Sequence, residues 1–247
     1  MADHCARTAG PPGWHPALPP GRPRRHSGRQ RAAFREHGGI AAHFRGRPAG
    51  GETWKKFNYS TYGYTLVGCV LEGAASQKYV DYVRDNVFGP AGMDHTQADD
   101  FFAVVPHRTR WYHKDKSGAV RNAGILDSSY KVPGGGLISS ADDMARFEAA
   151  ILADKLVKRA TRDLMWTPEK TTDGKSTGYA LGWGISDKLG VLMAAHTGGQ
   201  QGTSTAFAVV PERLAGVVVL ANMDGVDAGR LADDILKLVV DLQDTTP

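Results

Sequence analysis

The residues best placed to do chemistry in this sequence are His196, Thr197, Gly198 and Gly199, which follow the apolar run 191–195. An apolar run that ends in a polar residue and two glycines is typical of a buried strand whose last residues open onto a site. Glycines there let a ligand approach the backbone closely, so that N–H groups at the strand edge can donate hydrogen bonds to it. We therefore expect the end of this strand to form one wall of a binding site.

Three neighbouring segments complete the sheet that would position this wall. Two short apolar runs, 207–210 and 216–221, follow the site segment and are separated by the turn residues 211–213. Residues 179–185 alternate in the manner of a strand, with small residues on one face. The pattern predicts an antiparallel meander in which the strand that ends at His196 lies at or near the active edge.

Helical patterns surround the predicted strands. Apolar residues at helical spacing predict helices over 61–75, over 158–166 and after Asp227. Ser76 is expected to cap a helix that runs to Phe88 and stops at the turn 89–92, and Ser140 to cap another with Asp143 in the capping-box position. Helices followed by strands and a final packing helix indicate an α+β fold.

The chain divides at residue 52 into two predicted regions, 1–52 and 53–247. Residues 1–50 contain seven prolines, eight glycines, nine arginines and two acidic residues, and so carry a charge of +7. The rest of the chain therefore carries 4 − 7 = −3, which gives no reason to expect nucleic-acid binding by the folded part. We expect region 1–52 to be irregular or disordered; it could instead bind an anionic surface, or differ from the natural start of the domain.

Composition excludes several classes of site and partner. Two cysteines are too few for a metal-ligand cluster, and His107 and His113 lack partners at metal-ligand spacing. No apolar stretch has the length of a membrane-spanning helix, and the N-terminus lacks the apolar segment of a secretory signal. We expect no metal, no cofactor, no membrane partner and, by default, a cytoplasmic location.

Five motifs in sequence order give region 53–247 a resemblance to the serine β-lactamase and penicillin-binding-protein superfamily, on its class C and esterase side. It is most similar to the active-site-serine β-lactamase-like proteins. Segment 57–66 resembles the tyrosine motif of this group, and 88–93 its Pro-Leu-Gly-Met turn. The other three segments resemble its glycine-rich segment, its Gly-Tyr-Gly-Leu-Gly-Trp-Gly strand and its Lys-Thr-Gly motif; they are 129–140, 178–184 and 196–198.

The resemblance implies a β-lactamase/transpeptidase-like fold and hydrolysis of an ester, amide or β-lactam through an acyl-serine. It implies that the Tyr59 phenol moves the proton between the serine and the leaving group, and that Thr61 replaces the usual asparagine. His196 replaces the usual lysine and, being only partly charged near neutral pH, should hold a substrate carboxylate less firmly. This favours esters or peptides over β-lactams. Thr197 and Gly198 are expected to bind substrate, and the Gly199 N–H to hold the oxyanion.

The nucleophile of this family is missing from its expected place. It belongs to a Ser-x-x-Lys motif upstream of the tyrosine motif, where this chain has only the irregular region 1–52. Among eleven serines, only Ser128, with Lys131, has the spacing. Both lie downstream of Tyr59 and just before Pro133 and three glycines, so they are expected to be turn residues without a stable helical turn.

These observations leave three hypotheses about the chain. The first is a serine-hydrolase domain that lacks the N-terminal part of its fold and is weakly active or inactive. The second is a non-catalytic ligand-binding or interaction domain that keeps the cleft. The third is a fragment whose copies associate with one another through the core surface that a missing segment would leave exposed.

Overall fold

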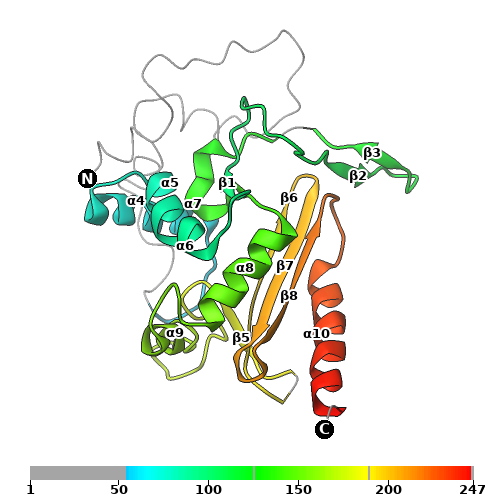
Figure 1. Cartoon of the computed structure of the whole chain (residues 1–247). Coiled ribbons are helices and arrows are strands. Elements are labelled where there is room, and N and C mark those ends of the chain that lie inside the picture. Colours follow the sequence, from blue (N-terminus) through cyan, green and yellow to red (C-terminus); the bar gives the residue numbers. More distant parts are fainter. Residues whose placement is uncertain (1–53, 125, 189, 246–247) are drawn as a thin grey trace.

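Helices and strands of the chain alternate around one main sheet (Figure 1). The computed structural model describes residues 54–124, 126–188 and 190–245, and the predicted region 1–52 lies outside them. The helices are α4 (Thr61–Ala75), α5 (Tyr79–Val83), α6 (Gly89–Ala91), α7 (Val132–Gly135), α8 (Ala141–Leu152), α9 (Arg159–Met165) and α10 (Ala228–Thr245). The strands are β1 (Gln97–Ala98), β2 (Tyr112–Lys114), β3 (Val120–Asn122), β4 (Leu137–Ile138), β5 (Gly184–Ser186), β6 (Met193–Gln200), β7 (Thr203–Val210) and β8 (Ala215–Ala221).

The main sheet has the order β5-β6-β7-β8, and every neighbouring pair is antiparallel. This confirms the predicted meander and the α+β arrangement. The last strand connection is the short 3₁₀ turn Pro211–Arg213, which ends with Leu214 in the left-handed conformation. The predicted strand 179–185 was wrong in extent, because only Gly184–Ser186 is strand and the chain turns just before it.

Each face of the main sheet is covered by helices. The α10 face packs strand residues such as Ala208 and Val210 against Leu236, which is fully buried. The opposite face packs Phe207 and Val209 against α8 and the segment that follows it, with Ile151 at the centre. Figure 1 shows α8 and α10 on the two sides of β6–β8. Alternation of side chains along the strands supplies both apolar faces at once.

Helix α4 begins after an N-cap at Ser60 and ends at a C-cap at Ser76. The Ser60 side chain accepts a hydrogen bond from the Gly63 N–H at 3.1 Å, which caps the first turn. The prediction that Ser76 caps the next helix was wrong. Ser76 has φ of 52° and ends α4, and α5 begins after Lys78 without a side-chain cap.

The segment predicted as one helix to Phe88 is a composite of three pieces. Helix α5 is followed by a π-helical turn, Arg84–Phe88, and then by α6. Gly92, with φ of 73°, ends this run, so helical structure continues through most of the turn expected to stop it. The buried side of the composite packs Val83 and Phe88 against α8.

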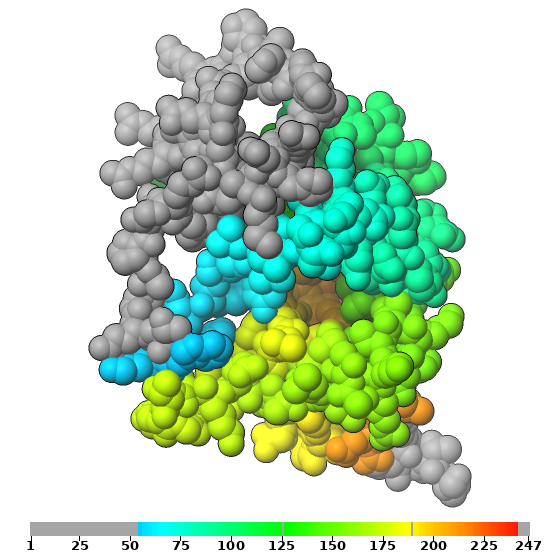
Figure 2. Space-filling model, turned by 90° about the vertical axis from the view of Figure 1, so that its left-hand side faces the viewer, coloured from blue at the N-terminus to red at the C-terminus, as the bar shows by residue number. Residues whose placement is uncertain are grey.

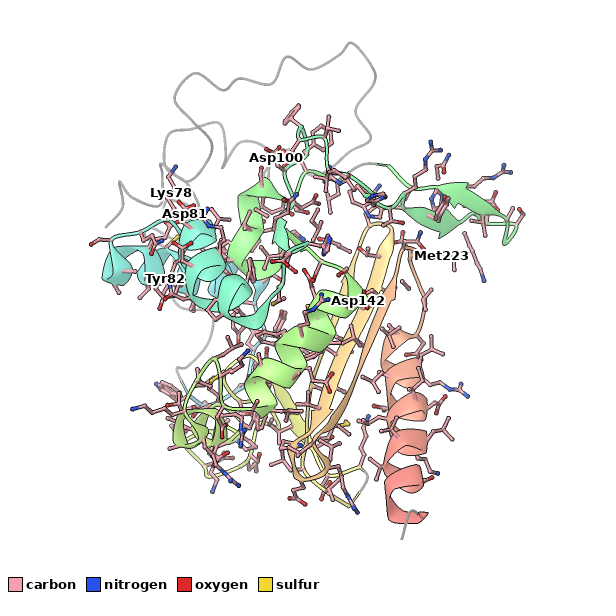
Figure 3. All side chains as sticks on the ribbon, in the orientation of Figure 1. Lys78, Asp81, Tyr82, Asp100, Asp142 and Met223 are labelled. Carbon is pink, nitrogen blue, oxygen red and sulfur yellow. The ribbon has the colours of Figure 1, made fainter. Side chains whose placement is uncertain are left out.

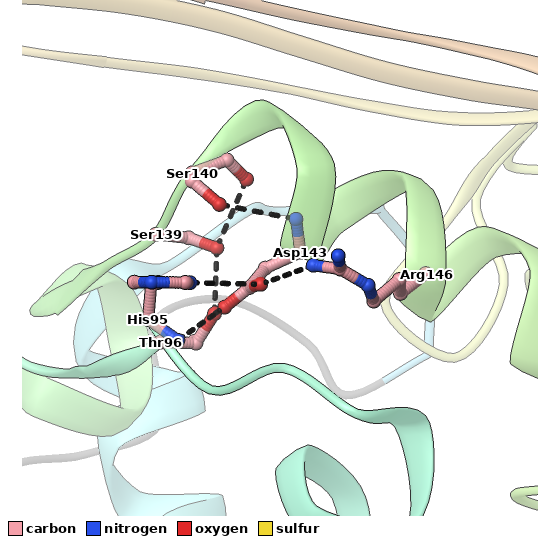
Figure 4. Close-up of polar contacts among 6 residues, drawn as sticks. All are labelled: His95, Thr96, Ser139, Ser140, Asp143 and Arg146. Carbon is pink, nitrogen blue, oxygen red and sulfur yellow. Dashed lines mark hydrogen bonds and ion pairs between the residues drawn. The ribbon is translucent and has the colours of Figure 1, made fainter.

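A polar cluster fixes the start of α8 (Figure 4). The Ser140 side chain accepts from the Asp143 N–H at 3.1 Å, as predicted. The fully buried Asp143 carboxylate accepts from the His95 N–H at 2.7 Å, the Thr96 hydroxyl at 2.8 Å and Arg146 at 3.0 Å. Burial by itself would raise the pKa of Asp143, but the interactions with Thr96 and His95 lower it below its usual value.

Two small two-stranded sheets lie outside the main one. β1 pairs with β4, and β2 with β3, both antiparallel. The β2–β3 pair projects from the body of the molecule, and Met223 lies at its base, where it forms a bridge with Tyr112 (Figure 3). Among the described residues, no helix combines the length and apolar character needed to cross a membrane.

Candidate functional site

The half of β6 that carries the predicted site residues has a free edge. β5 pairs only with Met193–Ala195, so His196–Gln200 has a strand partner on the β7 side alone. A turn lies directly before the first residue of β5 and keeps the strand from running alongside His196. In this turn the Ala180 N–H donates to the Trp183 carbonyl at 2.8 Å, and Gly182 has φ of 87°. The predicted site therefore lies on an exposed strand edge that a neighbouring turn keeps open.

The register of β6 with β7 determines which backbone groups face this edge. Gln200 is paired with Thr203 across a two-residue turn, and such a turn closes on a hydrogen-bonded pair. Hydrogen-bonded and non-hydrogen-bonded pairs alternate along an antiparallel ladder. Thr197 and Gly199 are then the residues whose N–H and C=O groups point away from β7. The Gly199 N–H is therefore available to a ligand at the edge.

The His196 ring is held at both nitrogens. Nδ1 lies 2.7 Å from the carbonyl oxygen of Thr197, and Nε2 lies 3.0 Å from the hydroxyl of Tyr179. A carbonyl only accepts, so Nδ1 carries a proton, and in the neutral ring Nε2 accepts from the Tyr179 O–H. The contacts thus orient the imidazole at the end of the apolar part of β6.

Tyr59 and Tyr179 complete a cluster of three rings with His196. The Tyr59 ring centroid lies 5.9 Å from that of His196 and 6.0 Å from that of Tyr179, and the Tyr179 and His196 centroids are 6.0 Å apart. Tyr59 immediately precedes the Ser60 cap of α4, so the capped helix start fixes its position. The structure therefore brings together two of the predicted residues, Tyr59 and His196, from elements far apart in the chain.

Tyr179 is confined by packing and by hydrogen bonds. Its ring lies 5.1 Å from that of Phe57, and its carbonyl accepts from the Thr177 hydroxyl at 2.9 Å. Burial raises the pKa of Tyr179 well above its usual value, and a hydrogen bond with Tyr64 adds to this. Tyr179 therefore keeps its proton, and its hydroxyl lies within hydrogen-bonding distance of His196 Nε2.

Thr61 and Thr197 both contact neighbouring helices. The Thr61 methyl packs beside α7, where a Cβ added to Gly134 would stand 3.1 Å from it. The Thr197 methyl lies 3.4 Å from the corresponding position at Gly229, in the first turn of α10. Thr197, Gly198 and Gly199 are all exposed.

Ser128 and Lys131 do not form a joined pair. Ser128 is buried, and its Oγ has no hydrogen-bond partner among the described residues. The Lys131 ammonium instead donates to the Gln200 side-chain oxygen at 2.8 Å. The expectation that no helical turn forms here was wrong, since the 3₁₀ turn Ser129–Lys131 runs into α7.

A cavity of about 290 Å³ lies between α8 and the sheet, beside His196 and Thr197. Its apolar floor and walls include Phe147, Phe207 and Leu220, and its polar end includes His196 and Thr205. In Figure 2 the molecule is hollowed between the cyan helical region and the yellow and green segments. Within the part of the chain that the structure describes, no group of three or more His, Cys, Asp or Glu side chains is placed to hold a metal.

Sequence reasoning missed Tyr179 and the contact between Lys131 and Gln200. Tyr179 was assigned to a strand, although Gly182 is a turn signal that would bring it back toward His196. Gln200 directly follows the two glycines of the site segment, but nothing local indicates its partner 69 residues away.

Comparison with known proteins finds serine beta-lactamase-like proteins and penicillin-binding proteins among the relatives of this chain. The mouse serine beta-lactamase-like protein LACTB, mitochondrial, is 32% identical over an alignment of 185 residues, which covers 64% of this chain and 33% of that protein. Penicillin-binding protein 4* of Bacillus subtilis is 24% identical over 182 residues, 67% of this chain and 40% of that protein. The chain thus spans about a third of the length of the mouse relative.

Solved structures share the fold. The octameric penicillin-binding protein homologue from Pyrococcus abyssi has a TM-score of 0.69 at 24% identity and covers 78% of this chain and 44% of its own. The D-amino acid amidase from Ochrobactrum anthropi, complexed with D-phenylalanine, has a TM-score of 0.61 at 18% identity, with 82% and 62% covered. The fold is therefore β-lactamase/transpeptidase-like, as expected. The beta-lactamase family model matches residues 5–241, and the chain belongs to that family.

Proposed function

We propose that this chain is a serine-hydrolase-family domain whose cleft binds acyl compounds, namely esters, amides or β-lactams, and that its own rate of hydrolysis is low. The observation that carries the proposal is the cluster of Tyr59, Tyr179 and His196 at the free edge of β6, with rings 5.9–6.0 Å apart. The Gly199 N–H faces the same edge. This combination would place a phenol and a backbone donor near one carbonyl group, beside an imidazole whose two nitrogens are already engaged.

The roles follow from the contacts of each group. His196 is oriented by Thr197 and Tyr179 and places an imidazole, rather than the lysine ammonium of the family motif, at this end of the strand. The half-exposed Tyr59 can reach a ligand at the edge. A carbonyl oxygen placed against the Gly199 N–H would lie in a strand-side oxyanion position. An imidazole in place of the lysine ammonium favours ester and peptide substrates over those that need a firmly held carboxylate.

Low hydrolysis is proposed because no described serine is ready to act as the nucleophile of this cleft. Ser128 has the Ser-x-x-Lys spacing, but it is buried, and Lys131 donates to Gln200. The same observation favours a second candidate function, a non-catalytic domain that binds an acyl ligand without a covalent step. The two functions differ in one measurable product, the acyl-enzyme.

The test uses the full chain with benzylpenicillin and a fluorophosphonate. Intact mass measures the covalent adduct, and calorimetry measures binding; nitrocefin and p-nitrophenyl acetate report turnover. We expect saturable binding that His196→Ala abolishes and that Lys116→Met, a change at the tip of the β2–β3 hairpin, leaves intact. A stoichiometric covalent adduct that is lost in Ser128→Ala would overturn the proposal that hydrolysis is slow. Absence of any binding would overturn the acyl-binding function itself.

A further inference from the structure

Lys131 is a partly buried cation with a neutral partner, Gln200, at the end of β6. Its ammonium donates to the Gln200 amide oxygen at 2.8 Å and lies 5.8 Å from the centre of the Tyr130 ring. Within residues 54–124, 126–188 and 190–245, no carboxylate forms an ion pair with it. An ammonium has three N–H donors, and Gln200 takes one of them.

The fold fixes this ammonium beside the site strand. The 3₁₀ turn Ser129–Lys131 and α7 pack against α4, where a Cβ added to Gly68 would stand 2.4 Å from the ring of Pro133. A Cβ added to Gly134 would stand 2.5 Å from the carbonyl of Thr61. These close approaches leave the backbone of the turn little freedom. Lys131 is therefore presented to β6 by a rigid support.

His196, Gly198 and Gln200 project from the same face of β6, because side chains alternate along a strand. Gly198 has no side chain, and a Cβ there would stand 2.6 Å from the Thr205 hydroxyl oxygen, so Thr205 lines the surface between the other two, which we call the slot. Four residues of strand place its ends about 13 Å apart. The imidazole and the aromatic rings lie at one end, and the Lys131 ammonium, held by Gln200, lies at the other.

We propose that Lys131 binds the carboxylate of an elongated acyl ligand whose acyl group lies at the His196 end of this slot. The proposal deepens the function proposed above, because it names the substrate class of the same cleft: acyl compounds with a second, negatively charged end. A carboxylate there would complete a charge-assisted hydrogen bond that Lys131 lacks among the described residues. Burial lowers the pKa of Lys131, and a bound anion would offset that desolvation.

Gln200 has a defined part in this arrangement. Its neutral amide oxygen positions the ammonium without neutralising its charge, which an acidic residue at that place would do. Gln200 is thus a positioning residue, and the charge remains available to the ligand. The polar contact also joins the turn before α7 to the last residue of β6.

The test compares two ligands that differ only in charge. Adipic acid monoanilide carries an aromatic ring, an amide and a carboxylate; its primary amide lacks the negative charge. Calorimetry with the full chain measures the affinity of each for the wild type, Lys131→Met, Lys131→Arg and the control Lys116→Met. Lys116 is exposed at the tip of the β2–β3 hairpin, so its replacement removes the same charge away from the slot.

We expect the wild type and Lys116→Met to prefer the acid over the amide by roughly tenfold, and Lys131→Met to bind both equally. Lys131→Arg should keep most of the preference, and rising salt should reduce it in the wild type, a measurement that needs no variant. Equal binding of both ligands by the wild type, no binding of either, or a preference that survives in Lys131→Met would overturn the proposal.

These outcomes are separable from those for the proposed function. A charge preference without any covalent adduct supports the role of Lys131 and argues for the non-catalytic function. An adduct with benzylpenicillin, together with equal binding of the two anilides, overturns the role of Lys131 and leaves acyl transfer standing.

Discussion

Replacing Glu148 by glutamine should stabilise the protein, and only above the pH at which a free glutamate ionises. Glu148 lies on α8 with its carboxyl group over Gly216 of β8, so closely that a Cβ at Gly216 would stand 2.1 Å from Oε1. Burial raises the pKa of Glu148 from 4.5 to about 7. In the folded protein the carboxyl group is thus protonated in a range where the unfolded chain has already released the proton.

The sign and size of the effect follow from this difference. Because the folded pKa is the higher one, the contribution of Glu148 to stability is fully present below pH 4.5 and is lost as the pH rises to about 7. A difference of 7 − 4.5 = 2.5 pH units corresponds to at most about 3.4 kcal/mol. The side chain is only partly buried, so solvent screening reduces the expected loss to about 1–2 kcal/mol.

Urea denaturation of the wild type and Glu148→Gln between pH 4.5 and 8.5 measures this loss. The two proteins should be nearly equal in free energy of unfolding at the lowest pH, and the variant should be more stable by about 1–2 kcal/mol above pH 7. Glu212→Gln is the matched control, since Glu212 is exposed and its replacement makes the same change in charge. A difference between wild type and Glu148→Gln that does not change with pH would refute the reasoning.

Three further changes test other parts of the structure. Gly216→Ala should lower the free energy of unfolding by about 1–3 kcal/mol in urea denaturation, because the new methyl group meets Glu148; no loss would contradict this packing. Asp143→Asn should cost about 1–3 kcal/mol in the same assay, since a fully buried, hydrogen-bonded carboxylate is replaced, and a neutral result would show that the charge is unimportant. Tyr179→Phe should move the ¹⁵N resonance of Nε2 of His196 toward that of an unbonded nitrogen while the proton stays on Nδ1; an unchanged resonance would deny the hydrogen bond.

Local signals predicted most of the fold. Apolar residues at helical spacing predicted the bounds of α4, and the apolar runs around 207–210 and 216–221 predicted β7 and β8. The failures arose where one residue type serves two local conformations. Ser76 can cap a helix start, but in the left-handed conformation it ends α4 instead.

The candidate site was predictable only in part. His196 stands out because of the strand-end glycines that follow it, and Tyr59 was indicated only by the resemblance of its segment to the tyrosine motif of the family. Tyr179 reaches His196 through a turn at Gly182, and turn geometry, not strand pattern, determines that contact. The contact between Lys131 and Gln200 is long-range and depends on how α7 packs, which no local pattern encodes.

The brevity of β5 has a consequence for the whole molecule. Had the strand continued backwards through Trp183 and Gly182, those residues would have paired with His196 and Thr197 and occupied the backbone groups that now face outward. The tight reversal at Gly182 prevents this lengthening. An extended peptide could instead align there as an added strand, so the same opening that admits a ligand also leaves the sheet vulnerable to pairing with another chain.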